Sequence, residues 1–245
     1  MSHSLRISEE FVSIQGEGPS KGCPSIFLRL QGCNLTCGGM NTLETKDLDS
    51  GATWRCDTME TWRYGDKWEI GTLLAEWKKK GYIKHLENGY HLVITGGEPL
   101  LQMEALSEFL QKLPEAHAEI ETNGCYRPSP ALEKQIHQFN VSPKLSNSGM
   151  PKEKRLVPDV LSYFSSLDTA HFKVVISSKS DLDELIEDIV KPYNIPMKRL
   201  WLMPAASSRD ELVEKSPKII EWALEIGARY SSRLQLVVWD ECCGV

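Results

Sequence analysis

The chain has 245 residues, of which 41% are hydrophobic and 25% charged, a balance that excludes a collagenous, low-complexity or wholly disordered protein. Its 28 basic and 34 acidic residues give a formal charge of -6, so no global positive field would attract nucleic acid. No run approaches the roughly 20 apolar residues that cross a bilayer, and we therefore expect a cytoplasmic protein with neither a nucleic-acid nor a membrane partner.

The first predicted strand is SIFLRL, residues 25–30, after a polar start. Residues 31–58 are rich in Gly, Thr and Asp and lack helical periodicity, which predicts a loop. Beyond this loop, helical and strand-like segments alternate. The predicted helices are IGTLLAEWKKKGY (70–82), PLLQMEALSEFLQKL (99–113), PALEKQIHQF (130–139), PDVLSYFSS (158–166), DLDELIEDIV (181–190) and SPKIIEWALEIGA (216–228). The predicted strands are HLVITGG (91–97), AEIETNG (118–124), FNVSPK (139–144), HFKVVISS (171–178), RLWLMP (199–204) and RLQLVVW (233–239).

This alternation predicts right-handed crossover units around a parallel sheet, either a barrel or an open sheet. Both architectures place their chemistry at the carboxyl ends of the strands. The clusters TGGEP, ETNG, SPK and MPAASS all follow predicted strands directly, so we expect them on one rim. No linker or repeat divides the chain, which predicts a single domain over 1–245 with an inserted cysteine-containing loop at about 33–62.

Three cysteines lie in that loop with the spacing C-x3-C-x18-C, at Cys33, Cys37 and Cys56. Three thiolates leave one position open on a metal centre that takes four ligands, and an open position is what a catalytic centre keeps for a substrate. Two alternatives stay open at this point: unligated thiols, and a zinc site completed by a distant histidine. The odd total of seven cysteines argues against a disulfide framework.

The motifs FVSIQGEG, IFLRLQGCNLTC, CDT, ITGGEPLLQ, ETNG, VSPK, FKVVIS and RLQLVVWDECCGV follow one another from about residue 8 to the last residue. In this order they resemble the 7-carboxy-7-deazaguanine synthase family of radical SAM enzymes. Members commonly show C-x3-C-x2-C-D-[TS], so the eighteen residues between Cys37 and Cys56 are a departure. A second departure is Gln235, where many relatives carry a histidine that can become cationic.

The resemblance implies an α/β fold, a partial TIM-like barrel of about six parallel strands. It implies a lyase that contracts the ring of 6-carboxy-5,6,7,8-tetrahydropterin to 7-carboxy-7-deazaguanine with loss of ammonia, in queuosine-type 7-deazapurine biosynthesis. The implied cofactors are a 4Fe-4S cluster, S-adenosyl-L-methionine and Mg2+. The implied partners are the pterin substrate, an electron donor such as flavodoxin, and a second copy of the chain in a homodimer.

The resemblance also implies residue roles. No side chain is expected to be catalytic, because the cofactor carries the radical. The expected cluster ligands are Cys33, Cys37 and Cys56, and the expected Mg2+ ligand is Thr58. The expected cofactor-binding residues are Thr95, Gly96, Gly97, Glu98, Ser142, Pro143 and Lys144. The expected substrate-binding residues are Ile14, Gln15, Gly16, Glu17, Arg29, Thr95 and Val245, the last through a terminal carboxylate.

Simpler interpretations compete with several of these roles. A GGEP sequence suits any tight strand-to-helix turn, because Gly and Pro favour such turns. An arginine inside an apolar strand, such as Arg29, needs a partner and can form a structural ion pair. For the whole chain, the alternatives are another radical SAM enzyme, such as an activase, and a zinc-stabilised binding module without catalysis.

Overall fold

The computed structural model describes residues 4–45, 47–49 and 51–240, and within them nine strands form one sheet in the order β3-β1-β2-β4-β5-β6-β7-β8-β9. The strands are β1 (Ser4–Ile14), β2 (Pro24–Leu30), β3 (Asp66–Glu69), β4 (His91–Gly96), β5 (Ala118–Thr122), β6 (Gln138–Val141), β7 (Ala170–Ile176), β8 (Leu200–Pro204) and β9 (Arg229–Tyr230). Six strands, β2, β4, β5, β6, β7 and β8, run parallel, and β9 adds a two-residue parallel edge. β1 pairs antiparallel with both β2 and β3. The expected partial barrel is confirmed: the sheet is mostly parallel and its two edges, β3 and β9, do not pair.

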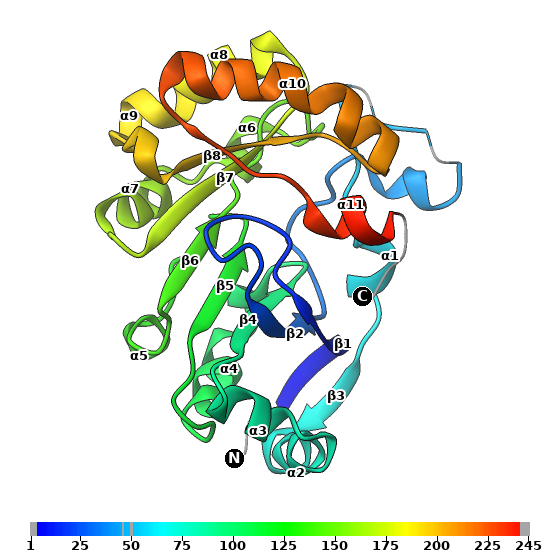
Figure 1. The fold of residues 1–245 in the computed structure, drawn as a ribbon, viewed down its shortest axis with the longest axis vertical. Coiled ribbons are helices and arrows are strands. Elements are labelled where there is room, and N and C mark those ends of the chain that lie inside the picture. The colour runs from blue at the N-terminus through cyan, green and yellow to red at the C-terminus, as the bar shows by residue number, and fades with distance from the viewer. Residues whose placement is uncertain (1–3, 46, 50, 241–245) are drawn as a thin grey trace.

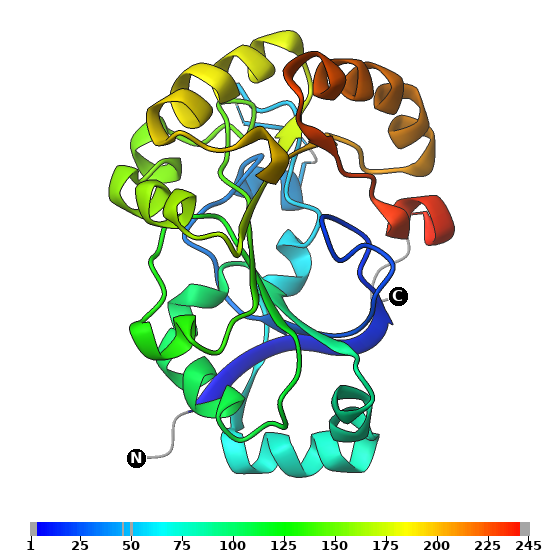
Figure 2. The same ribbon diagram turned by 60° about the vertical axis from the view of Figure 1, so that its left-hand side comes forward.

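Most of the helices lie on the outer side of this curved sheet (Figure 1), whereas the last helix, drawn in red, lies beside the loop between β1 and β2 (Figure 2). The α-helices are α1 (Met59–Trp62), α2 (Ile70–Lys80), α3 (Tyr82–Glu87), α4 (Met103–Leu110), α5 (Pro130–Glu133), α6 (Lys152–Arg155), α7 (Pro158–Ser166), α8 (Lys179–Leu185), α9 (Lys191–Tyr193), α10 (Arg209–Ile226) and α11 (Leu234–Trp239). Shorter helical turns are η1 (Met40–Leu43), η2 (Pro99–Gln102), η3 (Ile186–Val190) and η4 (Met197–Arg199). None of the described helices is both long and apolar enough to cross a membrane.

The two faces of the sheet differ in chemistry because successive side chains of a strand point to opposite faces. The face toward the helices carries fully buried apolar residues, such as Leu28, Ile94 and Phe172, which pack with Trp77 and Phe109 of the helical layer. The alternate positions are largely polar on the inner face. Arg29 stands opposite Thr95, and Glu121 opposite Asn140, in the parallel register. The inner face is therefore the side on which a polar ligand can be bound.

The structure corrects two predictions made from the sequence. SIFLRL is not the first strand: Ser4–Ile14 already forms β1, whose backbone pairs with both β2 and β3. The prediction of a final strand over RLQLVVW is wrong, since Leu234–Trp239 forms the helix α11. The edge of β8 is already paired by Arg229 and Tyr230, and the N–H of Leu234 instead donates to the carbonyl of Gly16 at 3.0 Å. A tertiary contact has overridden the β propensity of this segment.

Candidate functional site

The three loop cysteines lie together at the rim of the sheet. Although eighteen residues separate Cys37 from Cys56 in sequence, the N–H of Cys56 donates to the carbonyl of Cys37 at 3.1 Å. Cys33 and Cys56 pack against the small apolar cluster formed by Leu35, Cys37 and Cys125. The fold thus brings together the three cysteines that the sequence pattern selected.

The long insertion between Cys37 and Cys56 closes on itself, which explains how the two cysteines meet. Its first residue, Gly38, donates to the carbonyl of Ser148 at 2.9 Å, and near its end Thr53 donates to the carbonyl of Asn147 at 2.8 Å. The indole of Trp54 donates to the side chain of Asn147 at 2.9 Å. Both ends of the insertion are therefore tied to the same loop after β6, and the chain returns to its starting point.

Burial keeps the thiols of Cys33 and Cys37 protonated in the absence of a metal. Burial, with additional repulsion from Glu98 and the neighbouring cysteines, raises the pKa of Cys33 to about 12. Burial also raises the pKa of Cys37 to about 11, although Lys144 opposes this increase. A thiol with so high a pKa is inert as a nucleophile, whereas iron bound by the three sulfurs would deprotonate them outright. The donor set fits an iron-sulfur cluster with one open iron position.

Cys125 lies in the same apolar cluster but differs from the other three. Its Sγ donates to the carbonyl of Lys154 at 3.4 Å and lies 3.9 Å from that of Arg155, near the end of α6. A thiol that donates to carbonyls is protonated. We therefore find a structural role for Cys125.

The Gly-Gly segment after β4 packs directly against the start of the cysteine loop. A Cβ at Gly97 would lie 2.1 Å from the carbonyl oxygen of Gly32 and 2.7 Å from the Cβ of Cys33, and one at Gly96 would lie 2.2 Å from the carbonyl oxygen of Leu30. The N–H of Glu98 donates to the carbonyl of Gly32 at 2.8 Å. Glycine is required here by close backbone approach.

Glu98 holds the ends of two strands together. Its side chain is fully buried and accepts hydrogen bonds from the N–H groups of Leu100 and Asn123, and from the hydroxyl of Thr122. Burial raises its pKa to about 7, against the opposing effect of these hydrogen bonds. The carboxyl of Glu98 faces the ETNG turn and thereby holds that turn and the GGEP segment in place.

The SPK segment follows β6 on the same rim. The N–H of Ser142 donates to the carbonyl of Thr122 at 2.7 Å, Pro143 is buried, and Lys144 donates to the Ser142 hydroxyl at 2.9 Å. The ammonium of Lys144 also lies over the Trp54 ring, 5.8 Å from its centroid. The insertion therefore contributes an aromatic side chain to the neighbourhood of this lysine.

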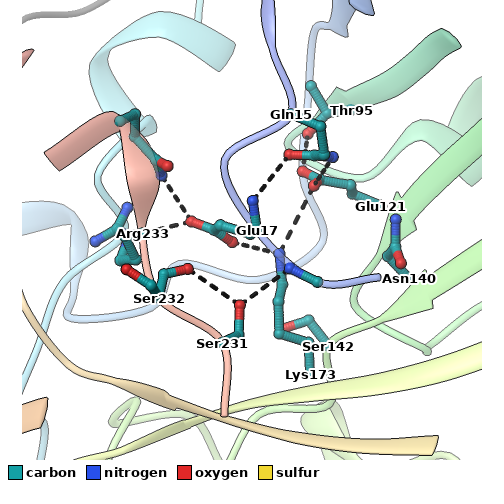
Figure 3. A network of polar contacts seen from close by, with 12 residues as sticks. Gln15, Glu17, Thr95, Glu121, Asn140, Ser142, Lys173, Ser231, Ser232 and Arg233 are labelled. Carbon is teal, nitrogen blue, oxygen red and sulfur yellow. Dashed lines mark hydrogen bonds and ion pairs between the residues drawn. The ribbon is translucent and has the colours of Figure 1, made fainter. Parts of the chain in front are cut away.

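The QGEG loop, residues 15–18, inserts into the concave side of the sheet, and Glu17 occupies its centre (Figure 3). The Glu17 carboxylate pairs with Lys173 of β7, with Arg233 at 3.1 Å, and accepts from Gln235 at 2.7 Å. Burial by itself would raise the pKa of Glu17, but Lys173 and Arg233 more than offset it and lower the pKa to about 2. Glu17 is thus an ionised carboxylate in a closed network.

Gln15 and Thr95 converge on Glu121, at the end of β5. The Gln15 amide donates to one carboxylate oxygen at 3.3 Å, and the Thr95 hydroxyl donates to the other at 2.9 Å. Lys173 lies 3.6 Å from the same carboxylate. Glu121 therefore joins the QGEG loop to the strand that leads into the GGEP segment (Figure 3).

Arg29 and Ile14 occupy different surroundings from the rest of the predicted substrate residues. Arg29 pairs with Glu9 of β1 at 2.7 Å, with its side chain 13% exposed, so the structural ion pair anticipated from the sequence is present. Its position opposite Thr95 nevertheless places it on the concave face. Ile14 is the last residue of β1 and its side chain is 41% exposed.

Gly16 and Thr58 each lie close to another residue, which is distant in the chain for Gly16 and nearby in the chain for Thr58. A Cβ at Gly16 would lie 2.0 Å from the side-chain oxygen of Gln235, so the loop approaches α11 closely. The hydroxyl of Thr58 lies 3.5 Å from the Sγ of Cys56, and the adjacent Asp57 pairs with Arg233. Val245 lies outside the described residues.

Two charged residues of the network, Lys173 and Arg233, were not among the predicted site residues. Lys173 interrupts the apolar strand FKVVI, and a lysine at such a position requires a buried partner. Its partner, Glu17, is 156 residues away and could not be identified from local pattern. Arg233 is the first residue of the segment predicted as a final strand, and only the actual helix α11, which it directly precedes, places it between Glu17 and Asp57.

Known proteins are similar to this chain in sequence and in fold. Residues 14–128 match the family model described as a 4Fe-4S single cluster domain. The 7-carboxy-7-deazaguanine synthase of Pyrobaculum aerophilum is 34% identical over 98% of this chain and 97% of its own length, and that of Hyperthermus butylicus is 33% identical over 96% and 92%. In three dimensions the chain is similar to the crystal structure of QueE from Escherichia coli, with a TM-score of 0.63, 24% identity and 93% coverage of each chain, which supports the same fold.

Proposed function

The chain belongs to the 7-carboxy-7-deazaguanine synthase family, and on this premise we propose which of its residues perform each part of the family's reaction. It is a radical SAM lyase with a 4Fe-4S cluster. Its reaction is the ring contraction of 6-carboxy-5,6,7,8-tetrahydropterin to 7-carboxy-7-deazaguanine with loss of ammonia, in queuosine-type biosynthesis. We assign the site because three cysteines converge next to Gly97.

In our proposal Cys33, Cys37 and Cys56 hold the cluster. When bound, the cluster and S-adenosylmethionine together supply the radical that abstracts hydrogen from the substrate. The close approach of Gly96 and Gly97 to the cysteine loop supports their role beside the cofactor, where strand-end carbonyls can accept from its ammonium group. Ser142 and Lys144 offer a hydroxyl and an ammonium on the same rim, suited to the cofactor's polar groups.

The concave face binds the pterin in this proposal. Gln15 and Thr95 present an amide and a hydroxyl around Glu121, and a pterin edge has adjacent donors and acceptors that such groups can match. The substrate carboxylate needs a cation, and Arg29 has the fork geometry suited to it. Glu17 keeps Lys173 and Arg233 in place through ion pairs, so we assign it a positioning role beside the substrate.

The remaining components are supported by individual contacts. Thr58, next to Cys56 and the Asp57 carboxylate, is proposed as a hydroxyl ligand for Mg2+, which prefers oxygen ligands and keeps several waters. Gln235 can hold Glu17 by a hydrogen bond but cannot become cationic, so a proton-transfer role is not assigned to it.

Electron delivery is proposed to occur at a cleft of about 480 Å³ that reaches Cys33. Arg6 and Arg63 line this cleft, and two guanidinium groups beside the cluster would attract an acidic donor such as flavodoxin. The homodimer is proposed to use α10, where Val213 and Leu224 are 67% and 77% exposed. Thiols that must stay reduced to hold iron support a cytoplasmic location.

The test is anaerobic turnover of the carboxypterin by reconstituted protein, with and without Mg2+. We expect 7-carboxy-7-deazaguanine to accumulate, and we expect Thr58→Val to lower turnover and its Mg2+ dependence more than it lowers uncoupled cleavage of S-adenosylmethionine. A protein that holds a full cluster and cleaves the cofactor but leaves the pterin unchanged would contradict the substrate assignment. An unaltered Mg2+ dependence in Thr58→Val would contradict the role of Thr58.

A further inference from the structure

A group of metal-ligating side chains lies at the amino ends of β4 and β5, opposite to the rim that carries the cysteines. His91 is the first residue of β4, His117 directly precedes β5, and Glu119 is the second residue of β5. Glu119 lies on the inner face, two residues before Glu121, and is fully buried. None of these three residues belongs to the site described above.

The ligand atoms of this group are already close together. The Nδ1 of His91 lies 2.7 Å from Oε1 of Glu119, and the Nε2 of His117 lies 3.8 Å from the same oxygen. One nitrogen from each histidine and one carboxylate oxygen all lie within 4.8 Å of one another. Zinc binds histidine nitrogen and carboxylate oxygen at about 2.0 to 2.2 Å, which separates tetrahedral ligands by roughly 3.4 Å. To reach this separation, the distances between the ligand atoms would have to change by up to about 1.4 Å, shared among three side chains.

Hydrogen bonds orient the carboxylate toward the histidines. Oε2 of Glu119 accepts from the amide groups of Gln138 at 2.9 Å and Asn140 at 3.0 Å, which leaves Oε1 directed at His91 and His117. Outer hydrogen bonds of this kind orient the carboxylate ligands of metal sites.

His117 has a ligand atom with no hydrogen-bond partner. Its Nε2 is buried and makes no hydrogen bond, while its ring packs on that of His91 with centroids 4.2 Å apart. A buried nitrogen without a partner costs free energy unless a donor, water or metal ion satisfies it.

The charge balance also favours a cation. Among the described residues, the only cation-forming side chains in contact with Glu119 are His91 and His117, which carry a charge only when protonated, and no lysine or arginine pairs with it. A buried carboxylate is costly unless it is paired or coordinates a metal. The side chains of His91 and His117 are 21% and 36% exposed, so solvent can supply a further ligand.

We propose that His91, His117 and Glu119 bind a divalent transition-metal ion, with Zn2+ as the probe, at a site separate from the cluster cysteines. Two imidazoles and one carboxylate with a water position are a donor set that Zn2+ accepts. The ion links β4 to β5 at the end of the sheet remote from the chemistry, so its role is to stabilise the fold.

The experiment titrates ZnCl2 into the anaerobically reconstituted holoenzyme, whose cluster occupies the loop cysteines. Bound zinc and iron are measured by mass spectrometry after desalting, and the thermal midpoint is recorded in parallel. His117→Phe removes the nitrogen but keeps an aromatic ring. His85→Phe is the matched control, because His85 stacks on Tyr90 and is not one of the three proposed ligands.

Wild type and His85→Phe should each retain one zinc per chain, with a midpoint raised by about 5 to 10 °C at a hundredfold excess over Kd. His117→Phe should bind zinc at least tenfold more weakly and show no such increase, with turnover unchanged. His91→Gln gives a second, independent variant with the same expectation. Wild-type holoenzyme that retains no zinc, or equal retention by His117→Phe and wild type, would overturn the proposal.

Discussion

Gly97→Ala tests whether close backbone approach positions Cys33. Gly97 does not adopt a left-handed backbone conformation, so alanine is compatible with its torsion angles and the change adds only a methyl group. The added Cβ would lie 2.1 Å from the Gly32 carbonyl oxygen and 2.7 Å from the Cβ of Cys33. To restore even a 3.0 Å contact, the backbone of Gly32 must move by about 0.9 Å.

The magnitude follows from what that movement breaks. The hydrogen bond from the N–H of Glu98 to the carbonyl of Gly32, now 2.8 Å, would be stretched beyond bonding distance. Loss of one such bond costs about 1 kcal/mol, and overpacking against backbone costs up to about 3 kcal/mol. We expect a loss of about 3 kcal/mol in the free energy of unfolding, which lowers the thermal midpoint by about 6 to 12 °C in a chain of this size.

The same displacement should impair the cluster, because Cys33 follows Gly32 directly. A misplacement of about 1 Å can cost roughly a hundredfold in rate when reacting groups must be held in position. The assay measures iron and acid-labile sulfide after anaerobic reconstitution, the thermal midpoint by circular dichroism, and the rate of S-adenosylmethionine cleavage.

Gly71→Ala is the matched control. Gly71 is exposed in α2, and a Cβ there would meet no atom within 4 Å. It should raise stability by about 0.5 to 1 kcal/mol and leave the cluster intact. The reasoning is refuted if Gly97→Ala keeps its full iron content, its midpoint within 2 °C of wild type and its cleavage rate within about twofold.

Two further predictions concern the thiols and the Glu17 network. Cys37→Ala should lose the cluster, whereas Cys125→Ala should retain it because its Sγ donates to backbone carbonyls; equal iron loss in both would contradict the ligand assignment. In wild type, the ion pairs of Glu17 stabilise the fold above its ordinary pKa of 4.5, and this contribution is lost as pH falls toward about 2. In Lys173→Met, the effect of burial on Glu17 should outweigh the remaining electrostatic attraction and raise the pKa of Glu17. Turnover should therefore fall more steeply than in wild type on acidification from about pH 8 to about pH 5. Parallel pH profiles would show that Lys173 does not hold Glu17 ionised.

Local patterns in the sequence determined the architecture and the reactive groups. Alternating apolar strands and helices predicted the parallel sheet, since each strand must bury one face under a helical layer. The clusters TGGEP and SPK directly follow strands, and the carboxyl ends of parallel strands meet on one edge, so the rim could be predicted without coordinates. Cys33 and Cys37 are near neighbours in sequence, which made their joint role visible.

Only the tertiary structure decided which distant groups meet. Cys56 reaches Cys37 because the insertion is tied to Asn147 and Ser148, and no local spacing rule describes such a closure. The segment from Leu234 to Trp239 has apolar residues suited to a strand, yet it is helical because the edge of β8 is already paired. Local propensity is worth tenths of a kcal/mol per residue, and a pairing between distant segments can exceed it. For the same reason the partnership of Glu17 with Lys173, 156 residues apart, could be recognised only in the folded chain.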